Sequence, residues 1–473
     1  MRSYNSKKGI MLINTIVYGA IAIILTTALV GWAGAVLKIS RQTHSREQAF
    51  EIAEAGIDYY RWHLAHAATD YQDGTGAPGP YVHDFRNKDG VVIGQFTLDI
   101  TPPPVGSTMV RVQSTGTVTE SPGISRKIVS QLAVPSFARF AVVANDVMRF
   151  GAGTETFGPI HSNNGIRFDG IAHNLVTSAR STYNDPDHSG NDEFGVHTHD
   201  SPTDPLPPAA VPARVDVFES GRQFPVPTVD FVGITADLSQ MKDDSIAGGR
   251  YFAASGGLGY HIVMRIDDTF DLYRVDSLTA TPNGCTPSSP PAGWGTWSVN
   301  GQTLLGNYAN PANGLIFLED NVWVNGQINT ARVTIAAARF PDDPAQRKNI
   351  IVNNDLLYTN YDSQDVISLI AQGHFSVGLA SENDLRIDAA IIAQNGRVGR
   401  YYYDSDCGSN YVRSQITLYG MIGSNQRYGF AYTDGTGYQT RNIIYDSNLL
   451  YSPPPSFPLT SDQYQIISWE EIQ

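Results

Sequence analysis

The sequence predicts an α+β protein built from a long N-terminal transmembrane-plus-amphipathic helix, a small antiparallel sheet and a large all-β head. Residues 10–37 contain no charged side chain, and residues 38–70 repeat apolar side chains at helical spacing. Helical patterning stops after residue 68, and the 473-residue chain contains 44 Gly, 27 Pro, 24 Tyr and 19 Phe. Such a composition is typical of loop-rich β proteins, so we expect β structure to follow the helix.

Residues 10–37 form the predicted transmembrane segment, because they exceed the about 20 apolar residues that cross a bilayer. A secretory signal has an apolar core of about 7–15 residues, so we expect this segment to remain in the mature protein after a basic leader of residues 1–9. Basic side chains flank the segment on both sides: Arg2, Lys7, Lys8, Lys38, Arg41 and Arg46. The charge rule therefore leaves the orientation open. We place the N-terminus in the cytoplasm and the head outside, because a large acidic domain follows the span.

Residues 38–70 are predicted to continue the helix with one apolar face. Phe50, Ala53, Ile57, Tyr60 and Leu64 recur at spacings of three and four residues, which places them on one side of a helix. The helix-breaking Gly and Pro residues within residues 73–80 predict that the helix ends near residue 70. Three alternating runs within residues 81–135 predict a small antiparallel sheet, and we expect its apolar face to cover the helix.

The head is expected in residues 140–178 and 314–450. Short apolar couplets recur there between turn signals such as Asn325-Gly326 and Asn395-Gly396, whose residues accept left-handed backbone. Strands this short suit a β-solenoid, in which successive coils bury each other's apolar faces. Because the spacing is irregular, a β-sandwich remains the alternative. Residues 179–313 are rich in Pro and Gly and are predicted to be a large insertion, with residues 451–473 as a C-terminal tail.

The chain has two cysteines, Cys285 and Cys407. In an exported protein such a pair predicts one disulfide. The bond would join the Pro-rich insertion to the loop of residues 401–410. Two separately buried thiols are the alternative.

A polar loop offers the candidate ion ligands. Its oxygen side chains alternate as in the first half of a calcium loop: Asp185, Asp187, Ser189, Asn191 and Asp192. The acidic ligand expected at the twelfth position falls on Val196, so the EF-hand pattern is incomplete and a solvated loop is the alternative. His197 and His199 follow directly, and an alternating histidine pair either binds a transition metal or is incidental.

Composition and motifs exclude several functions. The net charge is −14, and no cluster of Lys and Arg follows residue 70, which argues against nucleic-acid binding. The usual hydrolase, metalloprotease and nucleotide-binding motifs do not occur. We therefore predict a protein that is not an enzyme and has no cofactor other than the candidate calcium ion. A polysaccharide lyase or hydrolase is the enzyme alternative, because carboxylates that converge on a solenoid leave no linear motif.

The N-terminal region resembles a known family. The run Ala49-Phe50-x-x-Ala53-Glu54-Ala55-Gly56, after a basic leader and an uncharged helix, resembles PilX-type minor pilins and related type IV pilin-like proteins, and the resemblance extends through residue 135. It implies cleavage between Gly9 and Ile10 by a prepilin peptidase, and association of the helix with other pilin-like subunits and the pilus assembly machinery. In large-headed chains of this family, segments like residues 158–165 lie in what looks like a parallel β-helix.

Two positions depart from the family pattern. Pilins usually carry Phe just after the leader and Glu at the fifth mature position, where this chain has Ile10 and Asn14. Asn14 offers only hydrogen bonds, and loss of the acid fits an accessory subunit. Gly31 and Ala35 allow helices to approach closely, although small residues are also common in membrane helices.

The sequence thus predicts a structural minor-pilin-like subunit that inserts its helix into a pilus or secretion-type filament. A permanently anchored surface adhesin or glycan-binding protein that never polymerises is the alternative. Both functions place the chain as a single-pass protein in membrane lipid, and the first also places it in an extracellular filament.

Overall fold

The computed structural model describes residues 7–188, 190–231, 233–285, 295–460 and 463–472. The chain forms two compact units. Unit 1 contains Met1–Pro102, Val110–Ala133 and Asp462–Gln473, and unit 2 contains Pro103–Met109 and Val134–Ser461. The head is therefore inserted within the sequence of the N-terminal unit. The predicted organisation of a long apolar helix, a small antiparallel sheet and a large β-rich head is confirmed at this level.

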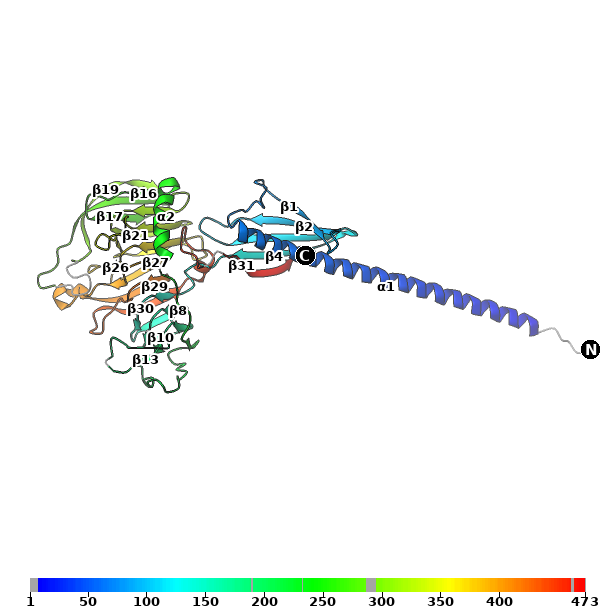
Figure 1. The fold of residues 1–473 in the computed structure, drawn as a ribbon, viewed down its shortest axis with the longest axis horizontal. Helices are drawn as coiled ribbons and strands as arrows, with labels where there is room; N and C mark the ends of the chain where they lie inside the picture. The colour runs from blue at the N-terminus through cyan, green and yellow to red at the C-terminus, as the bar shows by residue number, and fades with distance from the viewer. Residues whose placement is uncertain (1–6, 189, 232, 286–294, 461–462, 473) are drawn as a thin grey trace, which may run out of the picture. The chain divides into compact units, whose positions relative to one another are not determined.

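Unit 1 begins with helix α1, Lys7–His66, which is continuous in Figure 1. The helix contains no Pro, and its C-terminal half carries the apolar spacing that the sheet covers. It ends before the expected residue 70, because the Asp70 carboxylate accepts hydrogen bonds from the backbone N–H groups of Gln72 (2.9 Å) and Gly74 (2.6 Å). These bonds stabilise a turn that a continuing helix would not form.

The sheet of unit 1 is antiparallel and has the order β1-β2-β3-β4-β31. Its strands are β1 (Tyr81–Arg86), β2 (Val92–Thr101), β3 (Val110–Val118), β4 (Ser121–Ala133) and β31 (Gln465–Ile472). The three alternating runs of the sequence form β2, β3 and β4. Residues 451–473 were expected as a tail, whereas β31 pairs with β4 with Ile466 opposite Leu132.

Unit 2 is built mainly from parallel strands. Ladder 1 pairs ten strands in parallel, in this order: β16 (Arg250–Phe252), β20 (Leu315–Leu318), β22 (Arg332–Ala337), β25 (Val366–Ala371), β27 (Asp384–Ala393), β29 (Val412–Ser424), β5 (Val142–Ala144), β8 (Ile160–Ser162), β11 (Val176–Ser178) and β15 (Arg222–Gln223). Aliphatic side chains stack in register along it and are at most 1% exposed: Ile316, Ile335, Leu369, Ile391, Ile422, Val142, Ile160 and Val176. This stack forms part of the core of unit 2.

Two further parallel ladders complete the arrangement. Ladder 2 contains β17 (Gly259–Met264), β21 (Val322–Ile328), β23 (Ile350–Ile351), β26 (Phe375–Val377) and β28 (Val398–Arg400). Ladder 3 runs from β21 through β24 (Leu356–Tyr358), β27, β29, β30 (Gly437–Tyr445) and β7 (Thr154–Phe157) to β10 (Ile171–Ala172). Strands β21, β27 and β29 thus take part in more than one ladder.

Several further elements of unit 2 lie outside these three ladders. A short parallel sheet joins β6 (Met148–Phe150), β9 (Ile166–Phe168) and β14 (Val196–His197), and β12 (Thr182–Tyr183) pairs antiparallel with β13 (Glu193–Phe194). Strands β18 (Thr269–Leu278) and β19 (Val299–Ala309) extend β17 in antiparallel fashion. Short 3-10 helices span Ser405–Cys407, Ser409–Tyr411 and Ser447–Leu450.

The chain does not build ladder 1 in sequence order. It enters at β5, between β29 and β8, and proceeds through β11 to β15 at one end. Helix α2, Gly233–Gly248, then precedes β16 at the other end, from which the ladder returns to β29. Strands β15 and β16 both fall in residues 179–313, the range expected as an insertion, so part of that range belongs to the ladder.

Candidate functional site

The second half of α1 packs on the small sheet through the predicted face. Ala53, Ile57, Tyr60 and Leu64 are at most 1% exposed, so this part of the helix is locked into unit 1. Phe50 differs, because its ring is only partly buried and lies edge-on to Trp469 of β31, with ring centroids 5.7 Å apart.

Glycines allow the helix to approach the sheet closely. A Cβ added to Gly116 of β3 would lie 2.0 Å from the carbonyl oxygen of Ala49 and 2.5 Å from the backbone nitrogen of Ala53. A Cβ added to Gly56 would lie 2.3 Å from Ser114 Oγ. The motif that carries the family resemblance therefore serves, in this chain, to bring the helix backbone against β3.

The first half of α1 presents apolar side chains to the surroundings. Its most apolar window has no buried residue, and the helix is long and apolar enough to cross a membrane. The hydroxyl of Thr15 donates to the Met11 carbonyl at 2.8 Å, and that of Thr26 donates to Ala22 at 2.8 Å. The hydroxyl groups of these threonines are thus satisfied inside the helix, as a lipid environment demands.

The predicted processing and helix-packing residues lie on this segment. Gly9 and Ile10 are both within α1, and Ile10 is 60% exposed. Asn14, Gly31 and Ala35 are also exposed, and a Cβ on Gly31 would meet no atom within 4 Å. In a single chain these positions are uncovered, so their roles in processing and packing stay predictions.

The predicted calcium ligands point to different partners. Asp187 forms ion pairs with Arg427 and, at 3.4 Å, with Arg149; burial would raise the pKa of Asp187, but these two guanidinium groups lower it. Asn191 and Asp192 are exposed, and Ser189 lies outside the described residues. Among the described residues, Asp185 is the only one of the five that belongs to a group with metal-ligand spacing. Calcium binding by the five stays a prediction.

Asp185 instead joins a cluster with the two histidines that follow the loop. We call Asp185, His188, Glu193, His197 and His199 the His199 cluster. Two triads of potential ligand atoms share His199: Asp185, His197 and His199 form one, and His188, Glu193 and His199 form the other, with the atoms of each triad within 4.8 Å of one another. The alternating spacing of His197 and His199 is visible in the sequence. No sequence pattern indicates Glu193, because its position beside these histidines depends on the pairing of β13 with β12.

The backbone around the two histidines is fixed from both sides. His197 lies on β14, opposite Arg167 of β9. The backbone N–H of Thr198 donates to Asp204 Oδ2 at 3.1 Å, and that of His199 donates to Asp169 Oδ1 at 2.8 Å. These charge-assisted bonds fix the backbone at the histidines independently of any bound ligand.

Burial and neighbouring charges shift the pKa values of two members of the His199 cluster. Burial would raise the pKa of Asp185, but the His197 ring, the backbone N–H of Asp187 and the Arg167 guanidinium lower it to about 2. Burial lowers the pKa of His199, and Arg167 adds to this effect.

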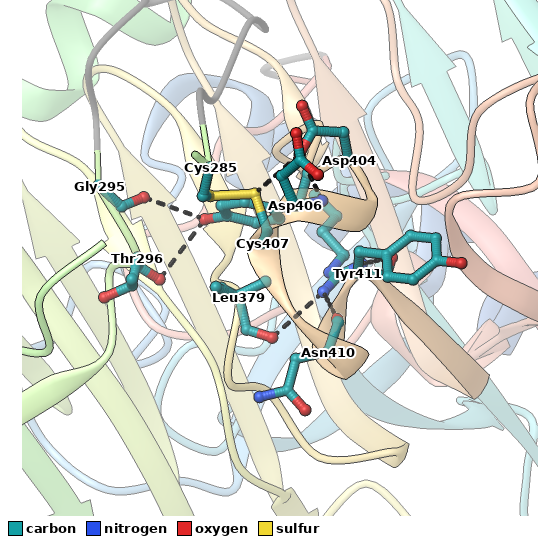
Figure 2. Close-up of a disulfide and its surroundings, with 11 residues drawn as sticks. Cys285, Gly295, Thr296, Leu379, Asp404, Asp406, Cys407, Asn410 and Tyr411 are labelled. Atoms are coloured by element: carbon teal, nitrogen blue, oxygen red, sulfur yellow. Dashed lines mark hydrogen bonds between the residues drawn. A yellow bond between two sulfur atoms is a disulfide. The ribbon is translucent and has the colours of Figure 1, made fainter. Parts of the chain in front are cut away.

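Cys285 and Cys407 form a disulfide, which Figure 2 shows together with its surroundings. The bond joins the insertion to the 3-10 helix Ser405–Cys407. Nearby, the buried Arg400 guanidinium donates to three backbone carbonyls, those of Tyr411 at 2.9 Å, Asn410 at 2.6 Å and Leu379 at 3.2 Å. Burial lowers the pKa of Arg400 to about 10, so it stays charged at neutral pH and ties these loops together.

No protein-family model matches the chain, and no curated protein matches it. Among solved structures, the chain is similar to the crystal structure of the competence-associated pilin ComZ from Thermus thermophilus, with 14% sequence identity, coverage of 90% of this chain and 97% of that chain, and a TM-score of 0.31. A TM-score of this size does not establish a shared fold.

Proposed function

We propose that the chain is a structural, non-enzymatic type IV pilin-like subunit of the minor-pilin kind. Helix α1 carries this proposal, because one continuous helix combines an exposed, uncharged apolar half with a half locked onto a small sheet. Exposed apolar surface of this length needs lipid or the apolar faces of other helices around it. In a filament the second environment replaces the first, without any change in the packing of unit 1.

The partners follow from this role. Before assembly, membrane lipid surrounds residues 10–37, with the N-terminus in the cytoplasm and the head outside. A prepilin peptidase cleaves between Gly9 and Ile10, and the freed helix associates with other pilin-like subunits and the assembly machinery. Asn14, Gly31 and Ala35 lie on the surface that would then face neighbouring helices, and small residues there favour close backbone approach.

We further propose that the head is a parallel β-helix that is displayed by the filament. Support comes from the parallel pairing along the three ladders and from the in-register stack of Ile335, Leu369 and Ile391. A β-sandwich is made of antiparallel sheets, whereas antiparallel pairing in unit 2 involves the strand pairs β12–β13, β17–β18 and β18–β19 among the described residues.

The N-terminal residue of the native protein tests the proposal. The native chain is purified from membranes and from sheared surface filaments, and its N-terminal peptide is identified by mass spectrometry. We expect a chain that begins at Ile10 and is present in the filament fraction. A Gly9→Val variant should keep its leader and be absent from filaments, whereas a Gly19→Val variant, which changes an exposed glycine of the same helix, should still be cleaved.

A permanently anchored adhesin or glycan-binding protein is the second candidate, and Asn14 is the observation that favours it. An uncharged residue at this position is compatible with permanent residence in lipid, where an ionised carboxylate would be costly. This function requires an intact leader in the native chain and its complete retention in the membrane fraction. That pair of results would overturn the pilin-like proposal.

A further inference from the structure

We propose that Asp185, His197 and His199 bind one divalent transition-metal ion of the Zn²⁺ class in the head. These residues come from the loop after β12 and from the end of β14, so an ion would connect two segments of unit 2. The inference is independent of whether α1 enters a filament, because every residue that carries it lies in the head.

Buried polar atoms without partners are the first observation. Asp185 Oδ2, both ring nitrogens of His197 and His199 Nε2 are buried and form no hydrogen bond with any residue that the structure describes. His197 is 0% exposed and Asp185 is 4% exposed. A buried polar group without a hydrogen bond destabilises the fold, and here such atoms belong to all three members of one triad with metal-ligand spacing.

The distances are the second observation. A tetrahedral zinc ion with bonds of about 2.1 Å places its ligand atoms about 3.4 Å from one another. His197 Nε2 lies 3.6 Å from Asp185 Oδ2, and the ligand atoms of all three residues lie within 4.8 Å of one another. The first separation is longer than most hydrogen bonds between such groups, but it is close to the edge of a coordination tetrahedron.

The local charge admits a divalent ion. Arg167 Nη1 lies 3.6 Å from Asp185 Oδ2 and would oppose a cation, but its Nε donates to Asp169 Oδ2 at 2.7 Å. Asp169 thus balances Arg167, and the carboxylates of Asp185 and Glu193 are left to balance an ion of charge +2. Glu193 is also held in place, since His188 Nδ1 lies 3.1 Å from its Oε1.

The ligand types select the class of metal. Calcium and magnesium prefer oxygen ligands throughout, whereas two imidazoles and a carboxylate suit zinc and other first-row transition metals. Three protein ligands occur in zinc sites that keep a fourth position for water or another group. The backbone next to these ligands is already fixed by Asp169 and Asp204, so the site needs little rearrangement to hold an ion.

Metal content of the full-length protein tests the proposal. The chain is purified in detergent, stripped with a chelator and titrated with ZnCl₂, and bound zinc is measured by elemental mass spectrometry after gel filtration. Variants Asp185→Asn and His199→Gln remove ligands with little change of shape. His261→Gln is the matched control, because both ring nitrogens of His261 already face partners, Gln302 at 2.7 Å and Asn325 at 2.7 Å.

We expect the wild type and the His261→Gln variant to bind one zinc ion more than the two site variants, or to bind it at least about tenfold more tightly, the smaller end of the loss seen when a supporting residue is removed. Circular dichroism of each variant checks that the head is folded. Equal zinc content in all four proteins would overturn the site.

A Glu193→Gln variant separates the two triads. If the proposed triad is correct, this variant retains zinc and Asp185→Asn loses it. Loss of zinc in Glu193→Gln and His199→Gln, with retention in Asp185→Asn, would overturn the proposed ligand set. Cobalt provides a second readout, since Co²⁺ in a tetrahedral site of nitrogen and oxygen ligands absorbs visible light, and that absorption should be missing from His199→Gln.

Discussion

Removal of the Cys285–Cys407 disulfide is expected to lower the free energy of unfolding of unit 2. The two cysteines are 122 residues apart in sequence. In the chain-entropy model, closing a loop of this length lowers the entropy of the unfolded chain by about 16 cal/mol/K, or about 5 kcal/mol at 25 °C. Measured effects of native disulfides are about 2–5 kcal/mol, so we expect a loss of about 3 kcal/mol.

The assay compares the wild type with a Cys285→Ser/Cys407→Ser variant in urea, followed by tryptophan fluorescence in the same detergent. With a urea dependence of about 3 kcal/mol/M, this loss lowers the unfolding midpoint by about 1 M. Reductant should shift the wild type by the same amount and leave the double variant unchanged. If oxidised wild type, reduced wild type and double variant all unfold at one midpoint, the reasoning from loop closure is refuted.

Three further predictions concern packing and pH. Gly116→Ala should destabilise unit 1 by about 1–3 kcal/mol because its Cβ would meet the helix backbone, whereas Gly123→Ala, with no atom within 4 Å of the new Cβ, should be neutral in thermal unfolding. Ile57→Ala, at a position 1% exposed, should cost about 2–4 kcal/mol in urea unfolding, and Val82→Ala, at a position 57% exposed, should have little effect. Burial and the charge of Arg397 lower the pKa of His374 to about 4, so the native state binds fewer protons than the unfolded state below about pH 6.5. The free energy of unfolding should therefore fall by up to about 3 kcal/mol as the pH falls toward 4. His374→Gln should flatten that part of the pH dependence of stability, and an unchanged profile would contradict this assignment.

Unit 1 could largely be predicted from the sequence, because its signals are local. Apolar spacing in α1 and alternation in β2, β3 and β4 report directly which face is buried. Strand β31 escaped prediction, since Gln465–Ile472 is mostly exposed and its pairing with β4 joins segments that are distant in sequence. The partner of Phe50 could not be predicted for the same reason, because Trp469 comes from that strand.

The strand pairing of the head could not be predicted from local sequence patterns. Short apolar couplets indicated short strands, but they do not specify which strands pair with each other. That β5 lies beside β29 follows from the burial of Val142 and Ile422 against each other in one stack, and no sequence spacing reports it. Likewise, the alternating oxygen side chains suggested Asp187 as a calcium ligand. Its ion pair with Arg427 joins residues 240 positions apart, which no local pattern reports.

The position of β31 in the sequence also determines when during synthesis β4 can be paired. Val134–Ser461, which make up most of unit 2, lie between β4 and β31 in the sequence, so a ribosome completes the head before it supplies the strand that pairs with β4. Until then β4 presents free N–H and C=O groups along one edge, a surface that can recruit strands from other chains. Chains whose synthesis stops within the head lack β31 and leave this edge of β4 open to strands of other chains.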